Sequence, residues 1–287
     1  MRVVLACLAC ITACGFQSGA GPGDAQIDTV PPDAVVSDAQ LPDAPIDAPI
    51  DAPVDAPPLV RVREGLIGLW TFDEAPGTRV TTTAGDTSPT GDPVPLKVSF
   101  GTVTFADGAL TPDGVAVIAS DPAPHLNADV VNGGGVTLEA WITTPDDDQG
   151  TVTAPVLIAG LSASIMSRNI SLLQVGKRWV ARVRTTADKN GKPDLTSTTD
   201  IVANRLTHVV VVADATQRIL YVDSQPVFVD PVAGPPLAWD AAYRMLLGNE
   251  FVRGRQWAGS FALVAIYNRA LPKPLIDTNF KVGANGP

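Results

Sequence analysis

Cysteine is absent from most of this 287-residue chain. The only three cysteines, Cys7, Cys10 and Cys14, lie close to the amino terminus. The rest of the chain therefore forms no disulfide and no cysteine-based metal site. A body of this length can bury an adequate core without such cross-links.

Glutamate and strong helix formers are also scarce. The four glutamates are Glu64, Glu74, Glu139 and Glu250, whereas Val, Thr, Gly and Pro are abundant. This composition indicates β structure with many turns and excludes a mainly helical domain. The single helix that we expect is a short one over residues 274–280.

Basic residues are missing from positions 3–60, which contain eight aspartates and no other charged residue. Of the 20 basic and 30 acidic residues in the chain, 19 and 22 therefore lie in residues 61–287, a net charge of −3. The acidity belongs to a tail, and the folded part is nearly neutral. No basic stripe is interleaved with aromatic residues, so nucleic acid is not an expected partner.

The amino-terminal segment has the features of an export signal. Arg2 precedes an apolar stretch, Val3–Thr12, that is far shorter than the ~20 residues needed to span a bilayer. The sequence Ile11–Cys14 resembles a bacterial lipobox, which implies a signal peptide over residues 1–13 and lipid attachment at Cys14. The alternative is an ordinary secretion signal that is cut later, after Ala20. By the same resemblance, Gly15 after the cysteine favours the outer membrane.

Residues 14–58 form an acidic, proline-rich segment that ends in a four-residue repeat, Asp43–Pro58. Proline at every fourth position blocks a helix and a central strand, and like charges at the same spacing extend the chain. We therefore expect a disordered stalk between the membrane anchor and a domain over residues 59–287. A passive linker is the alternative interpretation.

The centre of that domain is expected in residues 208–223. His208–Ala213 is apolar on both alternating faces, which is typical of a strand in the middle of a covered sheet. A short polar turn then leads to a second strand, Arg218–Asp223. The first strand of the domain is expected over residues 66–72. The other expected strands are 96–100, 102–105, 115–119, 136–143, 155–161, 170–175, 178–185, 226–229, 244–247 and 260–267. About a dozen short strands predict an all-β antiparallel sandwich or barrel.

Five short motifs resemble, in order, the laminin-G-like, concanavalin-A-like jelly roll in its bacterial variant. They are Gly65–Glu74, Gly108–Gly114, Val136–Ile142, Thr207–Val209 with Leu220–Asp223, and Trp257–Leu271. Each motif is weak alone, but together they span nearly all of residues 65–280. The resemblance implies an antiparallel jelly-roll β-sandwich.

The closing motif departs from the family pattern. Relatives usually carry Ile-Asp-Glu after the glycine, where this chain has Phe261–Leu263. The missing acidic pair often helps to bind calcium in relatives, so inherited calcium binding is disfavoured and no cofactor is expected. Asp146–Asp148 is a second place for calcium, but such a run is more often a solvated hairpin tip, and no metal site is assigned.

Catalytic patterns are weak in this sequence. Glycoside hydrolysis on this fold needs two carboxylates about 5–10 Å apart, but the glutamates are scattered and Glu139 is interpreted as structural. His125, in a Pro-rich stretch, and His208 have no Gly-x-Ser-x-Gly nucleophile to serve, and His208 is expected to bond locally and pack. We therefore predict no enzyme and no catalytic residues.

Arginines give the best candidates for ligand contacts. In the strand over 178–185, Arg178, Arg182 and Arg184 fall on one face and Trp179 on the other, which is interpreted as the core face. Arginines suit the carboxylate or sulfate groups of an acidic glycan, and the alternative is a solvated face paired with acidic residues. A second candidate patch is Arg253 and Arg255.

These observations predict an exported lipoprotein of the bacterial envelope, at the outer membrane or cell surface, with a non-catalytic module for a glycan or protein ligand. A mostly rigid loop rim or sheet face is enough for such binding. The alternatives are a diverged glycoside hydrolase and a purely structural envelope protein. Resemblance of fold does not fix function.

Overall fold

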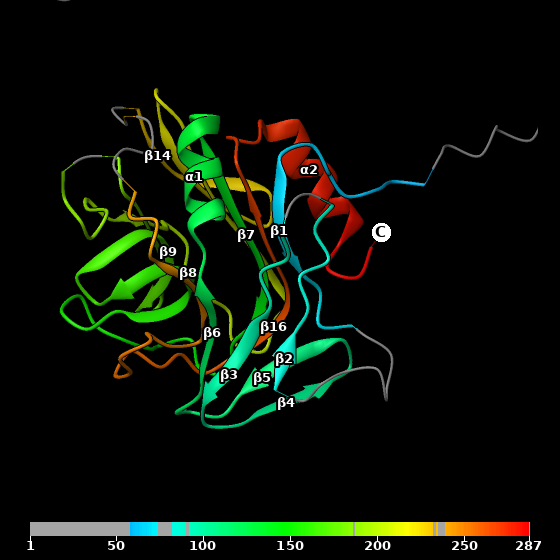
Figure 1. Cartoon of the computed structure of the whole chain (residues 1–287), viewed down its shortest axis with the longest axis vertical. Coiled ribbons are helices and arrows are strands. Elements are labelled where there is room, and N and C mark those ends of the chain that lie inside the picture. The colour runs from blue at the N-terminus through cyan, green and yellow to red at the C-terminus, as the bar shows by residue number, and fades with distance from the viewer. Residues whose placement is uncertain are drawn as a thin grey trace, which may run out of the picture. The chain divides into compact units, whose positions relative to one another are not determined.

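The computed structural model describes residues 58–73, 82–89, 92–185, 187–231, 234 and 239–286. All of these belong to one unit, Ala56–Pro287. The predicted signal peptide, Cys14 and nearly all of the 14–58 linker lie outside the described residues. The described chain forms two antiparallel sheets and two helices (Figure 1). No helix in this part is long and apolar enough to cross a membrane.

In the described chain, eight strands form the first sheet. Seven follow the order β14-β13-β12-β7-β16-β5-β4, and β1 pairs with β16. The strands are β1 (Leu66–Trp70), β4 (Val103–Ala106), β5 (Ala109–Pro112), β7 (Val136–Thr143), β12 (Thr207–Ala213), β13 (Arg218–Val222), β14 (Gln225–Asp230) and β16 (Ser260–Tyr267).

The second sheet also has eight described strands, in the order β11-β10-β9-β8-β15-β6-β3-β2. They are β2 (Thr83–Ala84), β3 (Leu96–Phe100), β6 (Val117–Pro122), β8 (Val156–Ser164), β9 (Ser167–Val175), β10 (Arg178–Val183), β11 (Leu195–Thr196) and β15 (Arg244–Leu247). The bounds of β3, β7, β15 and β16 match the predicted ranges. The strands β2, β5 and β11 were not predicted.

Strand β12 lies inside the first sheet and is buried on both faces, which confirms the prediction from its Val-rich sequence. Val209 and Val211 belong to the main core, whereas Val210 and Val212 belong to a second apolar cluster. Residues of helix α2 (Lys273–Val282) complete that second cluster. The helix therefore covers the outer face of this sheet.

Strand β10 shows the predicted alternation and positions the candidate site. Trp179, Ala181 and Val183 belong to the main core. Val180 belongs to a smaller cluster on the opposite face of the second sheet. Because side chains alternate along a strand, Arg182 shares the face of Val180.

Helix α1 (Pro124–Gly133) replaces the Pro-rich loop that was expected around His125. Its signals in the sequence are weak, because Ala123 gives no side-chain cap and the first turn has no acidic residue. Leu126 and Val130, one turn apart, are fully buried in the main core. Tertiary packing therefore stabilises a helix that local propensity does not favour.

The architecture confirms the prediction of an all-β, antiparallel jelly-roll sandwich. Helix α2 also confirms the predicted helix over 274–280, with slightly wider bounds. Most of the buried apolar side chains form one cluster that includes residues from both sheets. The sandwich is a rigid support for the loops at its edges.

Candidate functional site

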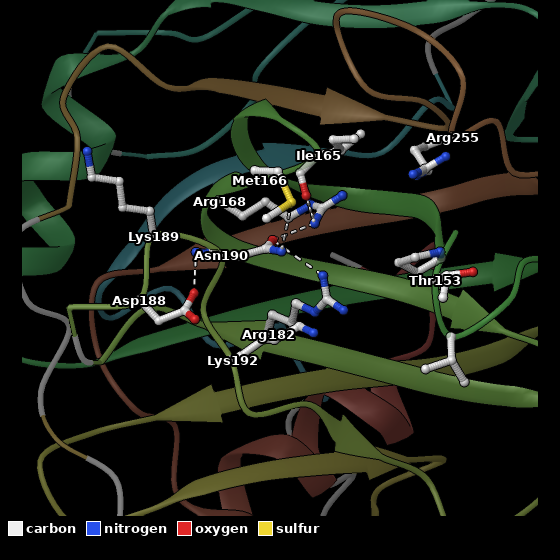
Figure 2. A pocket seen from close by; sticks show the side chains of 12 residues that line it. Thr153, Ile165, Met166, Arg168, Arg182, Asp188, Lys189, Asn190, Lys192 and Arg255 are labelled. Atoms are coloured by element: carbon white, nitrogen blue, oxygen red, sulfur yellow. Dashed lines mark hydrogen bonds between the residues drawn. The ribbon is translucent and has the colours of Figure 1, made fainter.

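An open pocket of about 710 Å³ lies where β9 and β10 meet four loops of the second sheet (Figure 2). One loop precedes β8, one joins β8 to β9, one follows β10 and one follows β15. Its volume is in the range of small-ligand sites. The lining residues are Val152, Thr153, Pro155, Ile165, Met166, Arg168, Arg182, Asp188, Lys189, Asn190, Lys192 and Arg255.

Arg168 is the most buried charge in this pocket, with only 1% of the residue exposed. Its Nε donates to Glu250 Oε1 at 2.8 Å, and its Nη1 donates to the carbonyl of Ile165 and to Asn190 Oδ1. Ser162 Oγ donates to the other oxygen of Glu250 at 2.7 Å. These bonds fix the guanidinium, because they and the ion pair together offset the cost of burying its charge.

Asn190 joins Arg168 to Arg182. Its Oδ1 accepts from Arg168 at 2.6 Å and from Arg182 Nη1 at 3.3 Å, and Figure 2 shows the three side chains pointing toward one another. Arg182 also makes two bonds to the carboxylate of Asp194, at 2.7 and 3.0 Å. The floor of the pocket is thus a connected polar network from β9, β10 and the loop after β10.

The rim carries further positive charge. Lys189 and Lys192 are exposed, and Arg255 is half-buried. Within the described chain, none of these three residues forms a buried ion pair like Arg168 with Glu250 or Arg182 with Asp194. Burial lowers the pKa of Arg168, Glu250 opposes that effect, and the charges of Arg182 and Arg255 lower the pKa further. Arg182 and Arg255 therefore each lie close enough to Arg168 to repel its guanidinium group.

The fold separates the arginines that were predicted as ligand contacts. Arg182 and Arg255 line the pocket. Arg178 does not line it and pairs at the surface with Asp200. Arg184 is buried, with 8% of the residue exposed. The three arginines therefore do not form one accessible row, and Arg178 and Arg182 pair with acidic residues, as the alternative interpretation expects. Ligand binding by these arginines stays a prediction.

Arg253 also lies away from the pocket. Its guanidinium carbon is 4.5 Å from the centre of the Phe100 ring, a cation–π contact at the surface. Arg253 and Arg255 are two residues apart in one loop but have different surroundings. This pair therefore offers a matched comparison of two charge changes.

Sequence reasoning missed Arg168, Lys189, Asn190 and Lys192. Arg168 lies two residues before the expected strand over 170–175, in the part of β9 that was not predicted, and its partner Glu250 is 82 residues away in sequence. The Lys189–Lys192 segment contains two lysines among polar residues, which is the signal that a basic loop leaves in a sequence. No pattern along the chain indicates that this loop meets Arg168.

Glu139 is the centre of a second buried polar cluster, on the outer face of β7. Arg61 and His208 contact its Oε1, and Asn279 donates to its Oε2 at 2.8 Å. Burial alone would raise the pKa of Glu139, but the charge of Arg61 and the contacts with His208 lower it to about 2. This environment agrees with the interpretation of Glu139 as a structural carboxylate. His208 also stacks on Trp141, as its predicted packing role requires.

The other described glutamates have separate partners. Glu250 pairs with Arg168 on the second sheet, and Glu64 pairs with Arg269 at the surface. Glu74 lies outside the described residues. Glu139 and Glu250 therefore contact different arginines in separate clusters and do not form a carboxylate pair of the kind that flanks a glycosidic bond.

The described aspartates make no cluster with His, Cys or Glu that would hold a metal ion. Asp113, a turn residue, accepts from Thr102 and from the backbone of Val115. Asp146 accepts from the backbone of Asp148, and Asp147 pairs with Lys177. These are the local roles expected of aspartates in turns.

A sialidase and a toxin binding domain are among the solved structures that share the fold. A sialidase of Trypanosoma rangeli is 19% identical, with a TM-score of 0.53, over 75% of this chain and 33% of the sialidase chain. The binding domain of botulinum neurotoxin DC, in complex with rat synaptotagmin II, is 12% identical, with a TM-score of 0.55, over 76% of this chain and 51% of that domain. The chain thus spans about a third of the sialidase and half of the toxin domain. A comparison with curated proteins gives no significant match.

The similarity to sialidases corrects one prediction. The sequence was interpreted as a protein that is not an enzyme, and that exclusion is contradicted because enzymes are among the structures that share the fold. At these identities the similarity shows the fold alone, so it assigns no activity to this chain.

The family is shown by sequence. A model of the concanavalin A-like lectin/glucanases superfamily matches residues 119–276, which is more than half of the chain. The matched region runs from β6 to α2 and contains all of the residues that line the pocket. The chain therefore belongs to the concanavalin A-like lectin/glucanase superfamily.

Proposed function

We propose that this chain is an exported, lipid-anchored protein of the bacterial cell envelope whose folded domain binds an extracellular glycan or protein. The observation that carries the binding role is the pocket at β9 and β10, where Arg168, Arg182 and Arg255 converge. A rigid sandwich holds this cluster, and ligand sites are commonly built from loops on such supports.

The similar structures support a binding role for the fold. The toxin domain was solved with synaptotagmin II, and one of the sialidase structures was solved with sialic acid. Neither ligand transfers directly to this chain, because the identities are 12% and 20%. They indicate only that a protein or a glycan is a reasonable class of ligand.

The envelope role is supported by the amino-terminal sequence. A short apolar segment, the lipobox-like Ile11–Cys14 and a long acidic, proline-rich stretch precede the domain. Several acyl chains would hold the protein at a membrane stably, where a single chain would not. A stalk of about forty residues at about 3.1 Å per residue would hold the domain up to roughly 100 Å away.

The anchor predicts a specific labelling result. Cys14→Ala is expected to abolish incorporation of an acyl-chain probe in cells, because the acceptor thiol is lost. Cys10→Ala is the matched control, since it changes a cysteine in the same segment and is expected to keep the label. Equal labelling of the wild type and Cys14→Ala would refute lipid attachment at this residue.

The binding role predicts different effects for two neighbouring arginines. The purified chain would be screened on an array of acidic glycans and acidic peptides, and then the variants would be measured on the best hit. Arg255→Glu is expected to weaken binding at least about tenfold, because it reverses a charge that lines the pocket. Arg253→Glu makes the same charge change outside the pocket and is expected to have a much smaller effect.

Salt provides an independent readout of the same prediction. Binding by the wild type is expected to weaken as ionic strength rises, because salt screens charges at the exposed rim. Thermal melting should show that both variants remain folded. Absence of any hit on the array, or equal losses in the two variants, would refute the pocket as the ligand site.

A further inference from the structure

The pocket at β9 and β10 has an excess of positive charge. Its lining includes the basic residues Arg168, Arg182, Lys189, Lys192 and Arg255 and one acidic residue, Asp188. Glu250 and Asp194 neutralise the two arginines of the floor. The other basic residues, Lys189, Lys192 and Arg255, outnumber Asp188, so the pocket keeps a positive charge and favours an anion.

Two guanidinium nitrogens in this cluster are buried without a hydrogen-bond acceptor in the described chain. Arg168 Nη2 lies 2.7 Å from Glu250 Oε1 without the geometry of a hydrogen bond, and Arg255 Nε is buried without an acceptor in the described chain. Buried donors without acceptors are costly, and a carboxylate accepts well from guanidinium groups. A carboxylate that enters the pocket would accept from these donors once small side-chain movements expose them.

The pocket also has an apolar wall at its mouth. Val152 and Met166 line it and are 79% and 64% exposed, which is unusual for large apolar side chains. Ile165 and Pro155 lie in the same lining. Methionine is flexible and polarisable, and it is common at surfaces that accept aliphatic side chains.

The lining contains no flat apolar surface. None of the 12 described residues that line the pocket is aromatic (Figure 2). A sugar ring or another planar group would therefore find no aromatic face to pack against. Aliphatic contacts beside guanidinium groups fit the side chains of a peptide better than they fit a sugar ring.

We propose that this pocket, as a deepening of the binding role proposed above, takes an acidic peptide segment of a protein partner. A carboxylate of the segment lies against Arg168 and Arg255, and an aliphatic side chain next to it packs on Val152 and Met166. Recognition of acidic motifs by arginine clusters is a recurring way of binding peptides. The lysines at the rim attract the segment and make its association dependent on salt.

Three synthetic probes test this assignment on the purified full-length chain by calorimetry. The first is a short blocked peptide with two acidic residues among leucines, and the second has the same charges among glycines and serines. The third is a short oligomer of a uronic acid, which has carboxylates on sugar rings. We expect the leucine peptide to bind about tenfold more tightly than either of the others, from the added apolar contact.

A double variant, Val152→Ser with Met166→Ser, isolates the apolar wall. It is expected to remove the preference for the leucine peptide and to leave the affinity for the glycine and serine peptide unchanged. Both side chains are largely exposed, so the melting temperature should stay near that of the wild type.

The possible outcomes separate this inference from the proposed function. Tighter binding of the uronic acid oligomer, or equal affinities for the two peptides, would overturn the acidic-peptide assignment and leave an anion-binding pocket in place. Failure of all three probes, with no hit on the earlier array, would overturn both. Tight binding of the leucine peptide that the double variant does not change would also overturn the assignment, because the contact would lie elsewhere.

Discussion

Glu250→Gln is expected to lower the free energy of unfolding by about 3 kcal/mol, one of the two largest effects expected in this domain. The substitution keeps the shape of the side chain and removes its charge. Arg168, with 1% of the residue exposed, then remains buried without its ion-pair partner. A buried charge without a partner is strongly destabilising, whereas removal of both charges together is often tolerated.

Urea-induced unfolding, followed by tryptophan fluorescence, measures this effect. The double variant Arg168→Met with Glu250→Leu is expected to recover at least half of the loss, because it leaves no buried charge behind. Glu64→Gln is the matched control, since its ion pair with Arg269 is exposed and contributes little. A loss for Glu250→Gln as small as that of the control would show that the ion pair does not hold Arg168.

The same variant connects stability to binding. Glu250 holds the guanidinium of Arg168, and Arg168 in turn holds Asn190 at the floor of the pocket. Loss of Glu250 should therefore weaken both the fold and the site. Arg255→Glu, at the half-buried rim, should weaken binding with little change in stability. Measuring both quantities in both variants distinguishes the support of the site from its ligand contacts.

The fold could be predicted from the sequence where burial follows the strand period. Val209 to Val212 are buried on both sides of the first sheet, and Trp179, Ala181 and Val183 face the core. Such patterns depend on neighbours in sequence, so they can be seen without a structure. Helix α1 could not be predicted in this way, because its stability depends on packing of Leu126 and Val130 against distant residues.

The candidate site was less predictable for the same physical reason. Arg182 was a candidate from its position in β10, and Arg255 from its loop. Their grouping with Arg168 depends on contacts between segments far apart in the chain, such as Arg168 with Glu250. The alternation of β10 gave the correct face for Arg182 but gave no sign that Asp194 engages it. The alternation along a strand predicts which sheet face a side chain lies on. The residues that contact it there come from distant loops and cannot be predicted from the strand.

Glu139→Gln is expected to cost about 3 kcal/mol near neutral pH and almost nothing near pH 2. The pKa of Glu139 falls from an ordinary value of 4.5 to about 2 in the folded protein, because Arg61 and His208 outweigh the effect of burial. A carboxylate with a lowered pKa stabilises the fold above its unfolded pKa. That stabilisation is lost as the pH falls through the folded value. Each pKa unit corresponds to about 1.4 kcal/mol, which gives the expected size.

Urea unfolding of the wild type and the variant at several values between pH 7 and pH 2 measures the difference. The difference is expected to be constant above about pH 5 and to shrink steadily between about pH 4.5 and pH 2. Other acidic groups titrate equally in both proteins and cancel. Thr137→Val is the matched control, since Thr137 is buried on the same strand, bonds to the backbone of Arg269 and does not titrate. A difference for Glu139→Gln that stays as independent of pH as that of the control would show that Glu139 is not held as a charged group by Arg61.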